Sequence, residues 1–198
     1  MSKISISRVE TALSITEIER GLKKYISLRD QIHEVNVSKD RQFQKDYAVF
    51  FLLTQARKNE EFLAPYFQYM ERHKNDDGLT FEAVLKHLYD NVGSVEPSFG
   101  SKLLSMINPK MPVWDSKVVE NLALKEPPHY RQKNGKKYAN IDELIEFYRE
   151  EICEWYNNHF NSGAAKEWIK LFDARYPETK SRITDVKKID LTLWQMQD

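Results

Sequence analysis

The sequence predicts an all-α protein of about eight or nine helices. Apolar residues recur at spacings of three and four along most of the chain, as they do in helices that bury one face. Residues that cap helix ends precede several of these segments, and short stretches rich in Asn, Gly or Pro separate them. Apolar residues near the C-terminus also alternate as in a strand, but no second strand segment is found to pair with them, so we expect a helix there too.

The composition is that of a folded domain with a sizeable core. Of the 198 residues, 41% are hydrophobic and 12% are aromatic, and we expect residues 1–198 to form a single all-helical domain. Thirty Lys and Arg residues balance thirty Asp and Glu residues. This neutrality argues against a protein whose main role is non-specific binding to nucleic acid, although a local basic patch could still bind one.

Cysteine and histidine usage predicts no metal and no other cofactor. Cys153 is the only cysteine, so the chain cannot build an internal disulfide or a multi-cysteine zinc or iron–sulfur site, and burial in a helix would leave the thiol inert. The five histidines are scattered and form no His-Glu-x-x-His motif. The N-terminus lacks a signal-peptide pattern and no segment has about eighteen uninterrupted apolar residues, so we expect a cytoplasmic protein without a membrane partner.

Three helices are predicted in the first third of the chain. Residues 1–13 show no strong pattern, and the first helix is expected from about 15 to 34. A second helix is expected from Ser38, and a third follows almost at once, with Phe62 and Leu63 on its apolar face. Pro65 falls early in this third segment, where the missing amide is tolerated if the helix proper starts there. Both carry many aromatic residues, which we expect to form the core rather than to stack on nucleic-acid bases.

The rest of the chain contains further predicted helices separated by turns. One is capped by Thr80 and ended by Gly93, and a short apolar one starts at Lys102. The others are expected at about 115 to 124, 140 to 160, up to Tyr176, and from 184 onwards.

Residues 125–138 are the most basic stretch of the chain. Pro127-Pro128 excludes a helix there, and five basic residues against one acid give the stretch a net charge of +4. We expect a loop that contacts nucleic-acid phosphates, and the alternative is a solvated surface loop. The candidate contact residues are Arg131, Lys133, Lys136 and Lys137.

The predicted helix at 140 to 160 is acidic on its outer side. Residues 142–154 contain six acidic residues and one basic residue, Arg149, so this helix is a poor surface for DNA. We expect it to face solvent or a basic protein partner.

Residues 96–119 carry the candidate chemistry. The stretch begins Glu-Pro-Ser-Phe-Gly-Ser-Lys and contains Val-Trp-Asp-Ser-Lys-Val near its end. We expect a turn, the short helix from Lys102, a break at Asn108-Pro109, and another helix that begins at Asp115. A lysine and an aspartate thereby lie at the two ends of one compact turn-helix-loop unit.

This order of elements resembles the helix-hairpin-helix DNA glycosylases, the superfamily of endonuclease III and the adenine glycosylases. Their hairpin reads Leu-Pro-Gly-x-Gly-x-Lys and their catalytic aspartate lies in Val-Asp-Thr-x-Val, which correspond here to residues 96–102 and 114–118. The chain departs from that pattern in three ways. Ser98 replaces the first hairpin glycine, the interval from Lys102 to Asp115 is shorter, and the four-cysteine iron–sulfur segment is absent.

The resemblance implies a glycosylase-like helical architecture, with a cleft near residues 96–119 if the domain has two lobes. It implies duplex DNA as the partner, DNA repair as the role, and hydrolysis of the N-glycosidic bond of a damaged or modified base as the reaction. Asp115 would stabilise positive charge on the sugar or orient water, and Lys102 would attack the sugar carbon in members with lyase activity. The hairpin amides would hold a DNA phosphate, at Ser98, Phe99, Gly100 and Ser101.

The residue types alone leave other interpretations open. Asp115 before Ser116 is also an ordinary helix N-cap, and Lys102 could be a surface lysine. The alternative function is therefore a catalytically inactive module on the same fold that binds DNA or a protein, so whether the chain is an enzyme stays open. A third possibility is a helical interaction factor that uses the acidic residues 142–154.

Overall fold

The structure, a computed structural model, describes residues 4–196 and is 64% helical. The predicted all-α class is confirmed, because a single two-stranded hairpin is the only sheet among the described residues. The elements are, in order, α1 (Ile6–Leu13), α2 (Thr16–Gln31), α3 (Arg41–Phe50), α4 (Glu60–His73), α5 (Phe81–Val92), α6 (Pro97–Ile107), α7 (Ser116–Asn121), β1 (Tyr130–Lys133), β2 (Lys136–Ala139), α8 (Ile141–Phe147), the π-helix η1 (Tyr148–Cys153), α9 (Glu154–Asn161), α10 (Ala164–Arg175), the short 3₁₀ helix η2 (Pro177–Thr179) and α11 (Asp185–Gln195).

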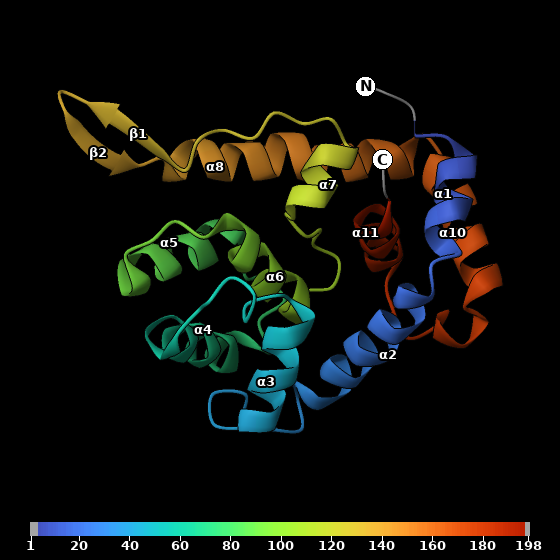
Figure 1. The fold of residues 1–198 in the computed structure, drawn as a ribbon, viewed down its shortest axis with the longest axis horizontal. Coiled ribbons are helices and arrows are strands. Elements are labelled where there is room, and N and C mark those ends of the chain that lie inside the picture. The colour runs from blue at the N-terminus through green and yellow to red at the C-terminus, as the bar shows by residue number, and fades with distance from the viewer. Residues whose placement is uncertain (1–3, 197–198) are drawn as a thin grey trace.

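Two groups of helices lie under one long helical rod (Figure 1). The rod consists of α8, η1 and α9, which follow one another without a break. On one side of the molecule α5 packs against α4, α6 and α8, and on the other side α11 packs against α1, α7 and α10. Helix α2 packs against α3 and connects the two groups along the lower edge of the view.

The aromatic residues of α3 and α4 form the core, as expected from the sequence. The Tyr47 ring centroid lies 5.4 Å from that of Phe67 and 5.9 Å from that of Tyr66, and all three side chains are buried. The Tyr47 and Tyr66 hydroxyls share a hydrogen bond of 2.8 Å, which satisfies both polar groups inside the core.

The helix-end signals at α5 are confirmed. The Thr80 hydroxyl accepts a hydrogen bond from the Ala83 amide at 3.2 Å, and Gly93 ends the helix with a left-handed φ of 73°. The predicted helices at 15 to 34, 115 to 124 and 140 to 160 correspond to α2, to α7 and to the rod. The C-terminal segment is helical, as α11.

Several helix starts differ from the predictions, and α3 begins at Arg41, after its cap Asp40, rather than at Ser38. Residues 6–13 form α1, whose Ser5 hydroxyl accepts a hydrogen bond from the Arg8 amide at 3.4 Å. Residues 1–3 lie outside the described part of the chain. Helix α4 begins at Glu60 rather than at Pro65, because the Asn59 side chain caps it by accepting from the Phe62 amide at 3.3 Å and the Phe62 side chain anchors its first turn in the core.

The expected loop at 125–138 is wrong in its second half, which forms a β-hairpin. Tyr130 pairs with Ala139 and Lys133 with Lys136, in an antiparallel register. The turn residues Asn134 and Gly135 have φ values of 52° and 74°, and this pair of left-handed residues fits the type I′ turn of a two-residue hairpin. The Asn-Gly dipeptide is therefore a local signal for strands that the helical interpretation overlooked.

None of the helices within residues 4–196 combines the length and the apolar character needed to cross a membrane.

Candidate active-site cleft

A cleft of about 620 Å³ lies between the two groups of helices. Its walls come from α2, the end of α3 with the turn after it, α6, α11 and residues 113–118, and its volume is in the range of pockets that take small organic ligands. The excess of basic over acidic side chains favours an anionic ligand, although the whole chain is neutral. The charged lining residues are Arg20, Lys24, Lys102, Lys117 and Lys187 against Glu17, Asp115 and Asp190.

The cleft contains the two residues that the sequence singles out for catalysis. The Lys102 ammonium lies 3.0 Å from Asp115 Oδ2, and the two side chains are only 8% and 10% exposed. Lys102 comes from the middle of α6 and Asp115 from the start of α7. The interpretation of Lys102 as a surface lysine is therefore wrong, and the lysine and aspartate meet as a buried ion pair that lines an open cleft.

Asp115 is a helix cap and a cleft residue at the same time. Its Oδ1 accepts a hydrogen bond from the Lys117 amide at 3.1 Å, while Oδ2 binds Lys102. The cap fixes the side-chain rotamer, so the carboxylate has one oxygen committed to the helix and one directed to the lysine. The two interpretations of this aspartate are compatible.

Ser101 holds the two ends of the 102–115 segment together. Its hydroxyl accepts a hydrogen bond from the Trp114 amide at 2.8 Å and donates to the Ser98 carbonyl at 2.8 Å. The Trp114 side chain is 1% exposed and packs with its ring centroid 4.8 Å from that of Phe147. A polar clamp on one side and an aromatic anchor on the other thus set where Asp115 enters the cleft.

The hairpin turn expected at residues 98–101 is not formed, because α6 already begins at Pro97. The Gly100 amide donates to the Glu96 carbonyl at 2.9 Å, as in a helix, and so does not offer itself to a phosphate. A side chain at Gly100 would contact Phe81 at 3.6 Å, which shows how closely α6 packs on α5. Ser98 and Phe99 lie in the first turn of α6, where amides lack partners within the helix.

The basic residues of the hairpin lie away from the cleft. Arg131, Lys133, Lys136 and Lys137 are exposed, and none of them lines the cleft. Figure 1 shows β1 and β2 at the end of the rod opposite to α10 and α11. Arg131 is paired with Glu143 at 2.6 Å, so only part of the predicted positive charge is free for a ligand.

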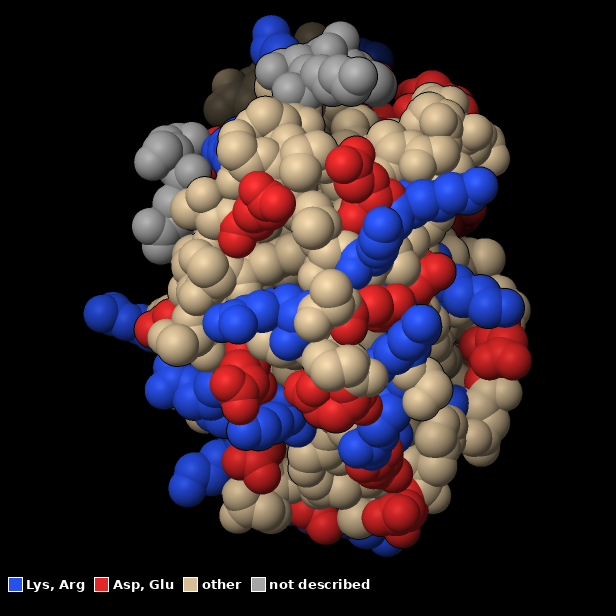
Figure 2. Space-filling view, turned by 90° about the vertical axis from the view of Figure 1, so that its right-hand side faces the viewer, with Lys and Arg blue, Asp and Glu red and all other residues tan. Residues whose placement is uncertain are grey.

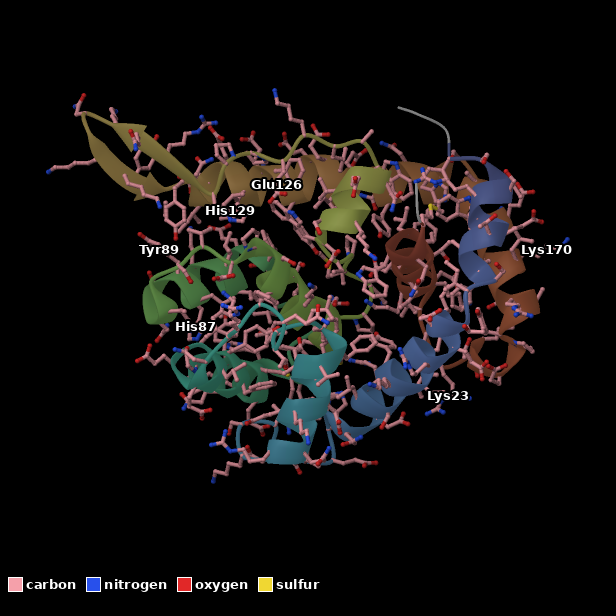
Figure 3. The ribbon with its side chains drawn as sticks, in the orientation of Figure 1. Lys23, His87, Tyr89, Glu126, His129 and Lys170 are labelled. Carbon is pink, nitrogen blue, oxygen red and sulfur yellow. The ribbon has the colours of Figure 1, made fainter. Side chains whose placement is uncertain are left out.

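Surface charge elsewhere is mixed. On the face turned to the viewer in Figure 2, basic and acidic side chains alternate without a large patch of one sign. Glu126 and His129 lie near the base of the hairpin in Figure 3 and are 2.9 Å apart, so they neutralise each other when the histidine is protonated. Lys23 and Lys170 point away from the molecule at its outer edge.

Sequence reasoning missed a second buried lysine–aspartate pair in the same cleft. Lys187 Nζ lies 3.0 Å from Asp190 Oδ2, with side chains 4% and 5% exposed. Asp190 Oδ1 also accepts hydrogen bonds from the Val113 amide at 3.3 Å and from the Tyr156 hydroxyl. Burial raises the pKa of the Asp190 carboxyl, while Lys187 and these hydrogen bonds act in the opposite direction.

A change of helix winding brings the rod into this network. Tyr148 donates to the Pro112 carbonyl at 2.7 Å, and Tyr156, eight residues later, donates to Asp190. In a regular α-helix of 3.6 residues per turn, residues eight apart are rotated away from each other by roughly 80°. The π-helix η1 between them has more residues per turn, so each residue turns by a smaller angle and Tyr148 and Tyr156 lie closer to the same face. Both hydroxyls therefore reach residues on the cleft side.

A second hollow of about 490 Å³ is lined by residues 56–62 and 91–94 and contains none of the predicted catalytic residues.

Comparisons of the chain with models of protein families, with curated proteins and with solved structures found no match. The chemistry of the cleft is therefore the basis on which a function can be inferred.

Proposed function

We propose that the chain is a DNA glycosylase-like hydrolase that cleaves the N-glycosidic bond of a damaged or modified base, with Asp115 as its catalytic carboxylate. The observation that carries the proposal is the buried Lys102–Asp115 pair at 3.0 Å, because it lines a cleft large enough for a base and its sugar. The resemblance of residues 96–119 to the glycosylases supports the choice of reaction.

The reaction needs a negative charge next to the sugar. When the bond between sugar and base breaks, positive charge develops on the sugar ring, and a nearby carboxylate lowers the energy of that state. Asp115 is held for this role by the Lys117 amide and by Lys102, so little reorganisation is needed when the sugar charge appears. The same carboxylate can orient the attacking water.

The ion pair also bears on whether the protein cuts the DNA strand. In the pair Lys102 is an ammonium ion, which has no lone pair with which to attack the sugar. Strand cleavage by the lysine would require the pair to open and the proton to leave. We therefore expect removal of the base without strand cleavage.

The basic lining of the cleft supplies a place for the DNA backbone. Arg20, Lys24 and Lys117 are exposed at the cleft and carry positive charge near the catalytic pair. The Lys117 ammonium lies 4.6 Å from the centre of the Trp194 ring, which orders it at the cleft wall. Phosphates on both sides of an extruded nucleotide could bind these side chains.

The second candidate is a catalytically inactive module that binds DNA or a protein. Its support is the helical conformation of residues 98–101, which replaces the expected hairpin and commits the Gly100 amide to the Glu96 carbonyl. The acidic side chains of the rod, exposed at Asp142, Glu146 and Glu150, could serve a basic protein partner in such a module.

The test is strand cleavage after alkali on a panel of duplexes, each with one damaged or mismatched base. Alkali opens abasic sites, so base removal is detected even when Lys102 forms no Schiff base. We expect Asp115→Asn to lower the rate at least about hundredfold, and Asp142→Asn, which changes an exposed aspartate of the rod, to leave it unchanged. An inactive wild type at enzyme excess and low salt would favour the binding module, whereas equal activity of wild type and Asp115→Asn would refute Asp115 as the catalytic carboxylate.

A further inference from the structure

The cleft contains one charged pair more than the proposed reaction uses. Lys102 and Asp115 account for the chemistry at the sugar, whereas Lys187 and Asp190 line the same cleft from α11 and have no part in that step. A buried ion pair contributes little to stability compared with apolar residues of the same shape. Because it lines the cleft, the pair is placed where a ligand can contact it.

The hydrogen-bonding capacity of the second pair is not exhausted. A carboxylate has about four acceptor sites, and Asp190 uses three of them, for Val113, Tyr156 and Lys187. A lysine ammonium has three donors, and one of those of Lys187 binds Asp190. The pair therefore retains one acceptor on Asp190 and at least one donor on Lys187.

Tyr25 adds a further unmet polar group beside the pair. The centre of its ring lies 5.1 Å from the Lys187 ammonium. Its hydroxyl is buried and has no hydrogen-bond partner among residues 4–196. Buried hydroxyls normally have a partner, so this one marks an unfilled hydrogen bond close to Lys187, although Tyr25 itself is not among the residues that line the cleft.

We propose that Lys187 and Asp190 form the recognition end of the cleft and bind the lactam edge of a nucleobase, in which a ring N–H stands beside a carbonyl. Lys187 donates to the carbonyl oxygen and Asp190 accepts the N–H. The choice of a base as ligand rests on the proposed glycosylase function. The substrate class is then a keto base, such as a damaged or misplaced form of uracil, thymine, guanine or hypoxanthine.

The fixed positions of donor and acceptor in the pair favour keto bases over adenine and cytosine. Adenine and cytosine carry an amidine edge, in which an exocyclic amino group stands beside a bare ring nitrogen, so donor and acceptor are exchanged relative to a lactam. In the orientation that places a lactam carbonyl at Lys187 and its N–H at Asp190, such a base would bring its amino group to the Lys187 ammonium and its bare nitrogen to the Asp190 carboxylate. Donor would face donor and acceptor would face acceptor.

The first test uses the wild-type protein and two isomeric ligands without a glycosidic bond, 1,5-dimethyluracil and 1,3-dimethyluracil. Both have the same formula, but only the first keeps the N–H between its two carbonyls. We expect it to bind about tenfold to hundredfold more tightly, the range of one hydrogen bond to a charged group, as measured by NMR titration of the Trp194 indole in the cleft. Equal binding of the isomers, absence of binding by either, or tighter binding of 1-methylcytosine would overturn the proposal.

The second test removes the pair without leaving a lone buried charge. The variant Lys187→Met/Asp190→Leu replaces both charges with apolar side chains of similar size, but it also leaves the Val113 amide and the Tyr156 hydroxyl without their acceptor, so its folding is checked by circular dichroism. We expect it to lose the discrimination between the isomers, while Lys170→Met, at the outer edge of the molecule, keeps it. If the double variant is unfolded by circular dichroism, the isomer comparison on the wild type still decides.

The two proposals fail in different ways. Discrimination between the isomers without any base removal from DNA would leave the recognition site standing and refute the glycosylase. Base removal that depends on Asp115 but keeps the same lesion preference in Lys187→Met/Asp190→Leu would refute the recognition site and leave the glycosylase standing.

Discussion

Replacing Lys102 with methionine leaves the Asp115 carboxylate buried without its cation. The side chains are 3.0 Å apart and 8% and 10% exposed, so solvent screens the pair little. Breaking a buried ion pair from one side typically costs about 3–5 kcal/mol. Because Asp115 keeps its hydrogen bond from the Lys117 amide, we expect the lower end, about 3 kcal/mol of unfolding free energy. For a chain of this length, that loss lowers the melting temperature by about 6–12 °C.

The double variant Lys102→Met/Asp115→Asn separates the buried charge from the lost packing. Asparagine can still cap α7 but carries no charge, so we expect the double variant to recover about half of the stability that Lys102→Met loses. Urea unfolding followed by circular dichroism measures both. The control is Lys23→Met, which removes an exposed ion pair with Glu19 and should change stability little. The reasoning is refuted if Lys102→Met is no more destabilising than Lys23→Met, or if the double variant is less stable than Lys102→Met.

Three further predictions concern other parts of the chain. Burial raises the pKa of Cys153 to about 11, so at pH 8 a thiol reagent should modify the native protein far more slowly than the unfolded one. Gly93→Ala should lower stability by about 1 kcal/mol in urea, because φ is 73° while no atom obstructs a side chain. Burial lowers the pKa of His87 and His159, so the unfolded state binds more protons than the folded state below pH 6.5, and the free energy of unfolding should decrease as the pH is lowered. His159→Phe should make this dependence on pH weaker.

The helices that the sequence predicted well are those whose ends carry local signals. Thr80 and Gly93 mark the two ends of α5. The Thr80 hydroxyl accepts from the Ala83 amide and Gly93 has a left-handed φ, and both features depend only on residues within four positions. Helix α1 was missed although Ser5 caps it locally, and its short apolar face of Val9, Ala12 and Leu13 packs on α10 and α11, at the other end of the chain. Short helices of this kind owe their stability to tertiary packing.

The candidate site also has features with a local signal in the sequence and features without one. Lys102 and Asp115 stand in one short unit, which the break at Asn108-Pro109 and the helix cap at Asp115 indicate, but their ion pair is visible only in the structure. The winding of the rod had no such signal, and the π-helix η1 was expected to be regular helix. The beginning of α6 at Pro97 also escaped prediction, since the glycine and serines of that stretch are typical of a turn in sequence but pack against α5 in the structure.

By itself the sequence determined the all-α class and the ends of α5, and it placed one lysine and one aspartate in the same short unit, because these features depend on neighbours along the chain. Only the tertiary structure decided that Lys187 and Asp190 are buried in the cleft. Their partners, Val113 and Tyr156, lie 77 and 34 residues from Asp190. On a helix surface the same spacing of lysine and aspartate would be an ordinary exposed pair. Whether a charge is solvated or held in a cleft is decided by what packs over it, and the packing partners here are distant in sequence.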